Sequence, residues 1–246
     1  MNDGQPLTSS LVSNLRTLSE RIDTASTSHL PEGKAPTLIA VSKGQSCASI
    51  RELYSLGVRH FAESYVQEYL KKIDELSDIK DISWHFIGAL QSNKAKKVIP
   101  TGCLIHSLDR FSLFEALCKS ARPEQPIQVL VQLQVDPLDL NKSGCTLEEA
   151  RQLCSLLVKN PGFDWQGFMG MGPLGKANDV LEIMYKELAD KARALWEEFS
   201  LRDPSRELRP MKLSLGMSDD LEVALKAGST HIRIGTALFG ERPQKT

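Results

Sequence analysis

The sequence predicts an α/β protein, a single (β/α)8 TIM barrel with an additional N-terminal helix. After residue 36, eight short apolar segments alternate with segments of helical periodicity. This order is typical of parallel strands joined by covering helices. The chain has 246 residues, with no shift in composition that would mark a domain boundary and no low-complexity segment. One large domain therefore accounts for the whole pattern better than two small ones.

The chain begins with a polar segment, residues 1–10, which we expect to be disordered. Ser9 or Ser10 can cap a helix that follows. The apolar residues of that helix recur at steps of four, three and four, at Leu11, Leu15, Leu18 and Ile22. A turn-rich connector from Pro31 to Pro36 separates this helix from the first strand.

The predicted strands follow the connector in order. They span residues 38–42, 58–62, 82–88, 103–107, 127–135, 164–170, 210–216 and 231–235. The helical patterns between them span residues 48–56, 65–77, 91–99, 110–120, 146–159, 178–200 and 218–227. Because only seven helices separate the eight strands, we expect the N-terminal helix to take the eighth place on the outer ring. Residues 11–246 then form one barrel domain.

The composition is that of an ordinary soluble protein, with 41% apolar and 25% charged residues and a net charge of −1. Such a balance favours neither nucleic acid nor an anionic membrane as a partner. The five cysteines are scattered and form no CxxC pair, so we expect no disulfide framework and no metal site. The first thirty residues contain no apolar core of a signal peptide, and no segment reaches membrane-spanning length. We therefore expect a cytoplasmic protein.

Lys43 follows the first predicted strand. Four apolar residues, Leu38 to Val41, run without a polar break before it, as in a strand buried on both faces. Lys43 then lies at the carboxyl end of the strand, where α/β barrels place their chemistry. Desolvation there would favour a neutral amine, which can form a Schiff base with an aldehyde. The alternative is a rim lysine that extends into water, as most lysines do.

The seventh and eighth predicted strands both end in a glycine followed by a hydroxyl residue. Gly216 would let the backbone approach a ligand, and Ser218 is a candidate N-cap of the next helix. Gly235 and Thr236 repeat the pattern after the eighth strand. In such barrels the loops after these two strands are the recurrent phosphate site, because free amides favour an anion. The alternative is a pair of turn glycines with an ordinary cap.

Two acidic residues qualify this prediction. Asp219 and Asp220 would repel a phosphate unless they face away from it. If they do, Lys43 across the barrel mouth completes a pocket for an aldehyde that carries a phosphate. The ligand of that description is pyridoxal 5′-phosphate.

Seven motifs over residues 37–240 resemble the YggS/PROSC family of pyridoxal phosphate homeostasis proteins, which share the barrel of the alanine racemase N-terminal domain. The motifs occur in the family's order, so their combination is far more specific than a single glycine-rich loop. They are Ala40-Val-Ser-Lys43, Tyr65-Val-Gln-Glu68, Trp84-His-Phe-Ile-Gly88, Leu90-Gln-Ser-Asn-Lys94, Lys142-Ser-Gly144, Leu213-Ser-Leu-Gly-Met-Ser-Asp219 and Arg233-Ile-Gly-Thr236.

The resemblance implies that Lys43 holds pyridoxal phosphate as a Schiff base. It also implies phosphate contacts from Ser218, Gly235 and Thr236, with Ser214 near the pyridine nitrogen and Arg233 close by. The remaining candidate cofactor-binding residues are Ser64, His85, Met169, Gly216 and Met217.

Some of these candidates have structural alternatives. His85 can equally be a hydrogen-bonded residue of a buried strand, and the two methionines can be core residues. Two segments also depart from the family pattern. Ser64 stands where the family usually has an asparagine, and Gly167-Phe168-Met169 replaces Gly-Leu-Met before a glycine-rich segment.

We expect a pyridoxal phosphate-binding protein that stores, delivers or buffers the cofactor in vitamin B6 and amino-acid homeostasis, without catalytic residues. It would act as a monomer, with cofactor-free pyridoxal phosphate enzymes as possible recipients. The alternative is an amino-acid racemase of the alanine racemase type. That reaction needs a second base, which alanine racemase takes from another domain, and no such domain follows this barrel in the sequence. A barrel enzyme acting on some other phosphorylated metabolite would leave Lys43 and the seven motifs unexplained.

Overall fold

The computed structural model describes residues 10–30, 34–136, 143–173, 175–200 and 209–241. Of the segment predicted to be disordered, only Ser10 is described, and it is the first residue of helix α1. Residues 1–9 lie outside the described part of the chain.

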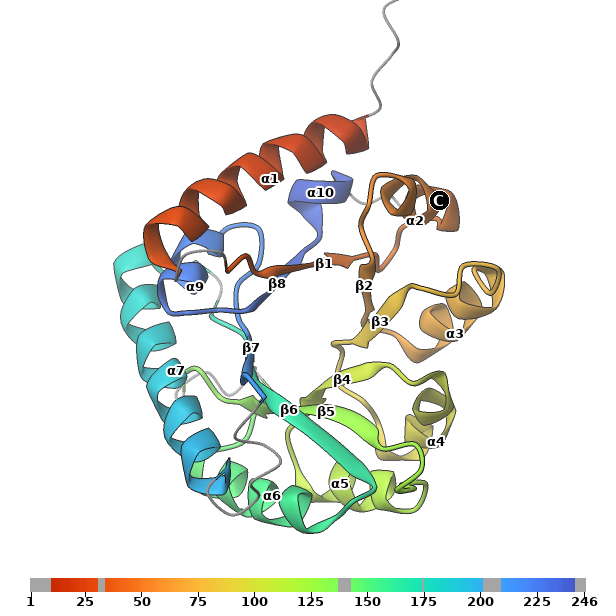
Figure 1. Cartoon of the computed structure of the whole chain (residues 1–246), viewed down its shortest axis with the longest axis vertical. Helices are drawn as coiled ribbons and strands as arrows, with labels where there is room; N and C mark the ends of the chain where they lie inside the picture. Colours follow the sequence, from red (N-terminus) through yellow and green to blue (C-terminus); the bar gives the residue numbers. More distant parts are fainter. Residues whose placement is uncertain (1–9, 31–33, 137–142, 174, 201–208, 242–246) are drawn as a thin grey trace, which may run out of the picture.

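All eight predicted strands are present. They pair in sequence order, every pair is parallel, and the eighth strand closes the barrel on the first (Figure 1). The prediction of a (β/α)8 barrel is therefore confirmed. The strands are β1 (Thr37–Val41), β2 (His60–Glu63), β3 (Ser83–Phe86), β4 (Leu104–Leu108), β5 (Ile127–Leu133), β6 (Phe163–Gly170), β7 (Lys212–Ser214) and β8 (His231–Ile234).

The helices follow the predicted pattern with small shifts at their ends. The pattern at 91–99 forms two short 3-10 turns, η1 (Ser92–Lys94) and η2 (Ile99–Thr101), around one turn of α-helix. A short helix after β8 was not predicted. The α-helices are α1 (Ser10–His29), α2 (Cys47–Ser55), α3 (Val66–Glu75), α4 (Ala95–Val98), α5 (Phe111–Cys118), α6 (Leu147–Lys159), α7 (Asn178–Ser200), α9 (Leu221–Lys226) and α10 (Thr236–Phe239).

Helix α1 takes the eighth place on the outer ring, as predicted. It crosses the barrel outside β8 and packs against α9, α10 and α2 (Figure 1). Its buried residues join one apolar cluster with Ile232 and Ile234 of β8. The side chain of Asn14 donates to the carbonyl of Leu238 at 3.0 Å, which fixes α1 to the chain that follows β8.

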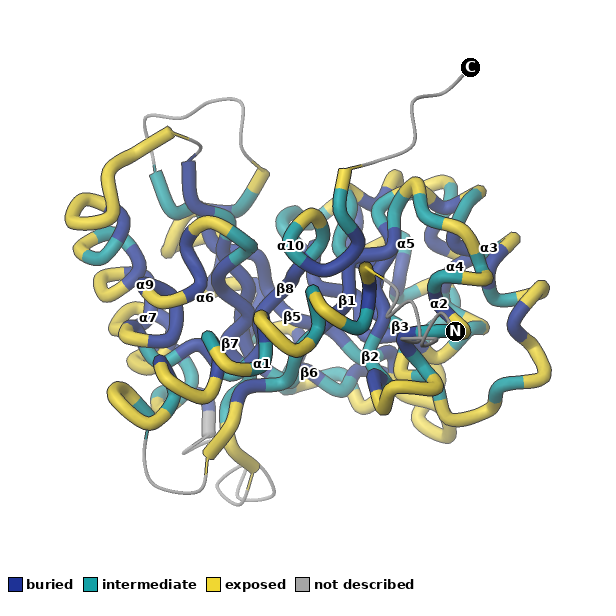
Figure 2. The backbone as a smooth tube through the Cα atoms, turned by 90° about the horizontal axis from the view of Figure 1, so that it is seen from above, coloured by how far each residue is buried: buried dark blue, intermediate teal, exposed yellow. Residues whose placement is uncertain are grey.

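The barrel interior contains polar side chains as well as apolar ones. Outward-facing residues of the strands, such as Phe61 and Phe168, pack under the helices, and the strands form the buried centre of the molecule (Figure 2). Inside, Arg233 of β8 donates across the barrel to the carbonyl of Gly170 on β6 at 2.9 Å. Such contacts between strands that are not neighbours are possible only through the interior. None of the described helices is long and apolar enough to cross a membrane.

Candidate functional site

Lys43 lies at the carboxyl rim of the barrel, as predicted. Strand β1 ends at Val41, and the half-buried Lys43 opens the turn that leads to Gly44. Ile39 and Val41 belong to the apolar cluster of the barrel interior together with Ala62. If the alternation of side chains along the strand extends to Lys43, it continues this inward-facing row. We therefore expect its amine to be directed toward the mouth rather than toward the covering helices.

A buried ion network holds the backbone on both sides of Lys43. The Nζ of Lys72, on α3, donates to the carbonyl of Ser42 at 2.6 Å and to Oε1 of Glu63 and of Glu68, each at 2.7 Å. Ser42 also donates its hydroxyl to Glu63 Oε1 at 2.7 Å. The amide of Gly44 donates to Glu68 Oε1 at 2.6 Å. The network thus fixes the residue before Lys43 and the residue after it.

Glu63 and Lys72 are functional candidates that the sequence prediction missed. Glu63 has no exposed surface and Lys72 is 4% exposed. Burial raises the pKa of Glu63, while the hydrogen bonds from Lys72 and Ser42 act in the opposite direction. The available signal was the spacing of Glu68 and Lys72, four residues apart on a predicted helix. That spacing is typical of exposed ion pairs as well, so it does not distinguish a buried network.

Replacing Lys72 tests the stability that the network supplies. Lys72→Met is expected to lower the free energy of unfolding by about 3–5 kcal/mol, because it leaves a buried carboxylate without a counter-charge. Urea denaturation measures the change. The matched control is Lys71→Met, since Lys71 lies next along the same helix in an exposed pair with Glu75 at 3.5 Å, and such pairs contribute about 0–1 kcal/mol. Equal losses in the two variants would contradict the role of the buried network.

The loops after β7 and β8 meet at the mouth. The hydroxyl of Ser218 accepts a hydrogen bond from the amide of Ala237 at 3.3 Å, which ties the first loop to the second. Gly235 lies against β1, because a Cβ placed on it would be 3.6 Å from Val41 Cβ. Thr236 follows it and is exposed. The structure therefore brings the predicted phosphate residues to the strand that carries Lys43.

The prediction that Ser218 caps the next helix is wrong. Helix α9 begins at Leu221, with Asp220 at the N-cap position and no side-chain cap bond. Asp220 is buried, and its carboxylate accepts from the amide of Met217 and from the hydroxyl of Tyr185, each at 2.5 Å. Asp220 therefore holds the loop in place through these two hydrogen bonds. The Ser218 hydroxyl is used instead between the two loops.

Gly216 has a packing role that the sequence did not indicate. Its φ of 85° is left-handed, and a Cβ there would lie 2.5 Å from Ala224 Cβ on α9. A glycine is thus required by the close approach of the loop to its own helix. Met217 is half-buried beside it, and Asp219 is exposed.

Ser214 and Arg233 form a buried pair inside the barrel. The Nη1 of Arg233 donates to the hydroxyl of Ser214 at 2.6 Å and to its carbonyl at 2.7 Å. On its other side the Ser214 hydroxyl is 3.2 Å from Nδ1 of His106. Burial lowers the pKa of Arg233, although Tyr185 and Asp220 act in the opposite direction. The residues predicted to be close together here are in direct contact.

Three other predicted site residues differ in how far they are buried in the barrel. Ser64 is half-buried at the end of β2, and its carbonyl lies so close to Gly88 that any side chain at residue 88 would overlap it. His85 is 3% exposed, with both ring nitrogens facing other imidazoles. Met169 is buried inside the barrel between Leu104 and Leu130.

The glycine-rich segment after β6 supplies backbone partners. The carbonyl of Gly170 accepts from Arg233, and the amide of Gly172 donates to the Tyr185 hydroxyl at 3.2 Å. A Cβ on Gly172 would lie 2.5 Å from that hydroxyl. The departure from the family pattern here therefore coincides with the packing of Tyr185.

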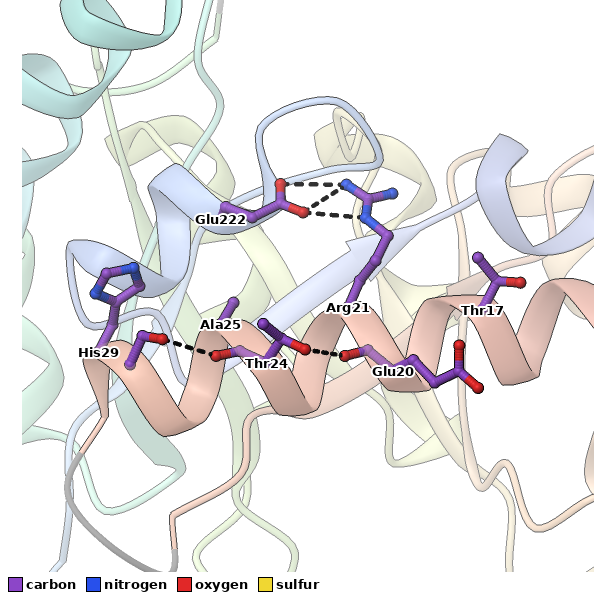
Figure 3. Close-up of a pocket in the computed structure, with 8 residues that line it drawn as sticks. Thr17, Glu20, Arg21, Thr24, Ala25, His29 and Glu222 are labelled. Carbon is purple, nitrogen blue, oxygen red and sulfur yellow. Dashed lines mark hydrogen bonds and ion pairs between the residues drawn. The ribbon is translucent and has the colours of Figure 1, made fainter.

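One hollow of about 420 Å³ lies away from the candidate site. It runs along α1 and is lined by Arg21 and Glu222, which form a forked ion pair (Figure 3). Arg21 also donates to the carbonyl of Ser218 at 3.3 Å. The hollow contains none of the predicted site residues, but its arginine helps to hold the Ser218 loop.

The fold and the site together define a class. The barrel has a lysine after β1, and the loops after β7 and β8 are joined by the hydrogen bond between Ser218 and Ala237. Residues 11–243 of the chain match the family model described as the N-terminal domain of alanine racemase. A protein of Synechocystis sp. named pyridoxal phosphate homeostasis protein is 40% identical over 206 residues, covering 83% of this chain and 91% of its own. The protein of that name from Escherichia coli is 35% identical over 233 residues, covering 93% and 95%. The chain belongs to the family of pyridoxal phosphate homeostasis proteins.

Solved structures agree with this assignment. PipY of Synechococcus elongatus, determined with pyridoxal phosphate bound, is 35% identical with a TM-score of 0.75 and covers 94% of this chain and 100% of its own. The same protein without the cofactor has a TM-score of 0.78 at 34% identity, covering 93% and 99%. An alanine racemase from E. faecalis has a TM-score of 0.64 at 17% identity, covering 93% of this chain and 58% of its own. That last likeness shows the fold alone.

Proposed function

We propose that this protein binds pyridoxal 5′-phosphate as a Schiff base on Lys43 and stores, delivers or buffers it. The observation that carries the proposal is the meeting of three groups at one end of the barrel. Lys43 follows β1, Gly235 lies beside the same strand, and Ser218 is bonded to the loop that follows Gly235. The names of the relatives and the cofactor-bound PipY structure support this choice of ligand.

The donor set fits the cofactor. An amine suits its aldehyde, and the hydroxyls of Ser218 and Thr236 suit its phosphate. Of the two nearby carboxylates that would repel a phosphate, Asp220 is bonded to Met217 and Tyr185, and Asp219 is exposed to solvent. The remaining candidate contacts, from Ser64, His85, Met169, Gly216 and Met217, are proposed on the family resemblance.

The same residues support a role without robust catalysis. When bound, pyridoxal phosphate acts as an electron sink, most strongly when a carboxylate keeps its ring nitrogen protonated. Here the proposed partner of that nitrogen is Ser214, a neutral hydroxyl already bonded to the cationic Arg233. A nearby cation disfavours a second positive charge. The residues therefore suit holding the cofactor better than activating it.

Delivery follows from the chemistry of the proposed linkage. A Schiff base on one lysine can be exchanged for another amine, so cofactor-free pyridoxal phosphate enzymes are suitable recipients. We propose that the protein does this in the cytoplasm, which its scattered cysteines without a CxxC pair support, and that it acts as a monomer.

A binding comparison tests the proposal. The cofactor-free protein is expected to bind pyridoxal 5′-phosphate with a visible absorbance band, and Ser218→Ala is expected to weaken this binding much more than that of unphosphorylated pyridoxal. A lost hydrogen bond to a charged oxygen corresponds to about 1.5–3 kcal/mol. Thr236→Val tests the second hydroxyl in the same way. Equal weakening toward both ligands would show that these residues do not contact the phosphate.

The racemase alternative makes a different prediction. L-alanine added to the loaded protein in deuterium oxide should exchange its α-hydrogen no faster than with free pyridoxal phosphate. Chiral chromatography and mass spectrometry measure this directly. Rapid exchange with interconversion of the enantiomers would favour the racemase.

A further inference from the structure

A line of three imidazoles crosses the barrel interior to Ser214. Nδ1 of His60 is 3.0 Å from Nε2 of His85, and Nδ1 of His85 is 2.9 Å from Nε2 of His106. Nδ1 of His106 is then 3.2 Å from the Ser214 hydroxyl. The line starts at the first residue of β2, which lies at the amino end of the barrel and is partly exposed. It ends at Ser214, the last residue of β7, which is bonded to Arg233 of β8.

The surroundings of these imidazoles favour their neutral form. His85 and His106 are 3% and 0% exposed, and burial lowers the pKa of both well below the usual value. The other titratable groups that act on the line add to this effect. Lys212 of β7, together with His231 and Arg233 of β8, also favours the neutral rings.

The tautomers of neutral imidazoles in this line depend on one another. A neutral imidazole carries one hydrogen, on one of its two nitrogens. At each contact one nitrogen must donate and the other must accept. If His60 carries its hydrogen on Nδ1, His85 must accept on Nε2 and carry its own on Nδ1, and His106 must do the same. All three rings therefore carry hydrogen on Nδ1, or all three carry it on Nε2.

The two arrangements leave Ser214 in two different states. With hydrogen on Nε2 in each ring, Ser214 donates its hydroxyl to His106 and keeps a lone pair for a donor in the cavity. With hydrogen on Nδ1, His106 donates to Ser214, and the hydroxyl can donate into the cavity. Arg233 donates to the same oxygen in both cases. Neither arrangement leaves an imidazole contact unpaired.

We propose that His60, His85 and His106 form a proton relay between the amino end of the barrel and Ser214. A proton accepted by the Ser214 oxygen displaces its hydroxyl hydrogen to Nδ1 of His106. The Nε2 hydrogen of His106 passes to His85, that of His85 passes to His60, and that of His60 leaves to water. One proton enters and one leaves, and nothing is oxidised or reduced. The relay rests on the proposed function, in which the ring nitrogen of the cofactor lies at Ser214.

The first test uses the cofactor-free protein. Long-range ¹H–¹⁵N spectra of ¹⁵N-histidine-labelled protein show which nitrogen of each ring carries hydrogen. We expect His60, His85 and His106 to be neutral and protonated on the same nitrogen at neutral pH. His231 is the control, because it lies outside the line and its Nδ1 is 2.8 Å from the Thr230 hydroxyl. A mixed pattern, or a charged ring in the line, would overturn the relay.

The second test measures proton transfer after the protein has been loaded with pyridoxal 5′-phosphate. His60→Phe is expected to slow the absorbance change after a rapid pH jump by about 100-fold. This factor is the lower end of the rate loss expected when a positioned proton carrier is removed. Affinity for the cofactor should not change, because His60 lies at the opposite end of the barrel from Lys43. His60→Gln keeps a hydrogen-bonding side chain that cannot relay, and it should be equally slow if the fold is intact.

His231→Phe is the matched control for both variants, since His231 is another histidine at the amino end of the barrel that lies outside the line. It should leave the rate of the absorbance change unaltered. An unchanged rate in both His60 variants would overturn the relay even when the cofactor binds normally. Absence of cofactor binding would instead contradict the proposed function, and the spectra of the cofactor-free protein would still decide whether the three rings form one line.

Discussion

Lys43→Ala is expected to abolish covalent attachment of pyridoxal phosphate while leaving the fold intact. The amine is the only group of Lys43 that can form the proposed linkage, so its removal should eliminate the absorbance band of the lysine-bound cofactor completely. The fold should survive because Lys43 is partly exposed and the turn around it is held by other residues. Lys72 bonds the carbonyl of Ser42, and Glu68 bonds the amide of Gly44. Neither contact uses the Lys43 side chain.

Borohydride reduction makes the linkage permanent and allows it to be located. In the unsubstituted protein, the reduced cofactor should be found on the peptide that contains Lys43, and in Lys43→Ala no labelled peptide should remain. Circular dichroism and thermal unfolding check that the variant is folded. Lys71→Ala, which removes an exposed lysine from α3, is the control and should keep the band. A band retained in Lys43→Ala would place the cofactor on another lysine and contradict the assignment.

The position of Lys43 could be predicted because it depends on local pattern. A run of four apolar residues defines a buried strand, and the topology of the barrel fixes which end of that strand carries chemistry. The boundaries of β1 and of α7 were close to those predicted for the same reason. Helix α10 was not predicted, since four residues give too little periodicity to recognise.

The contacts between distant residues could not be predicted from the pattern. Ser218 has the ordinary features of a helix cap, yet its hydroxyl accepts from Ala237, which is 19 residues further along the chain. His106 lies beside Ser107 in a strand whose other residues are apolar, and alternation does not say which face of that strand is inside. Lys72 looks like an exposed helical lysine until the fold places α3 over Ser42. Each of these roles depends on barrel closure, which brings separate strands together.

Mild acid is expected to destabilise the protein strongly, because three buried histidines remain neutral in the fold. Burial lowers the pKa of His231 from 6.5 to about 3, and it holds the pKa values of His85 and His106 well below the usual range. The same residues in the unfolded chain titrate near pH 6.5. Below that pH the unfolded chain binds protons that the folded protein does not bind. The free energy of unfolding must therefore fall as the pH decreases.

The size of the effect follows from linkage. Between pH 7 and pH 5, each histidine that stays neutral in the fold lowers the free energy of unfolding by about 2 kcal/mol, so three of them lower it by about 6 kcal/mol. That loss is comparable to the whole stability of a typical domain, about 5–15 kcal/mol. Urea denaturation at a series of pH values measures it, and most carboxylates titrate below this window.

His231→Gln separates this explanation from a general effect of acid. It removes one titrating group, so the loss of stability between pH 7 and pH 5 should become smaller by about one third, or about 2 kcal/mol. The comparison is made within each variant across pH, so any constant cost of the substitution cancels. A stability that does not change over this window would show that the buried imidazoles are charged in the fold. In that case neither the acid sensitivity nor the neutral line of His60, His85 and His106 would hold.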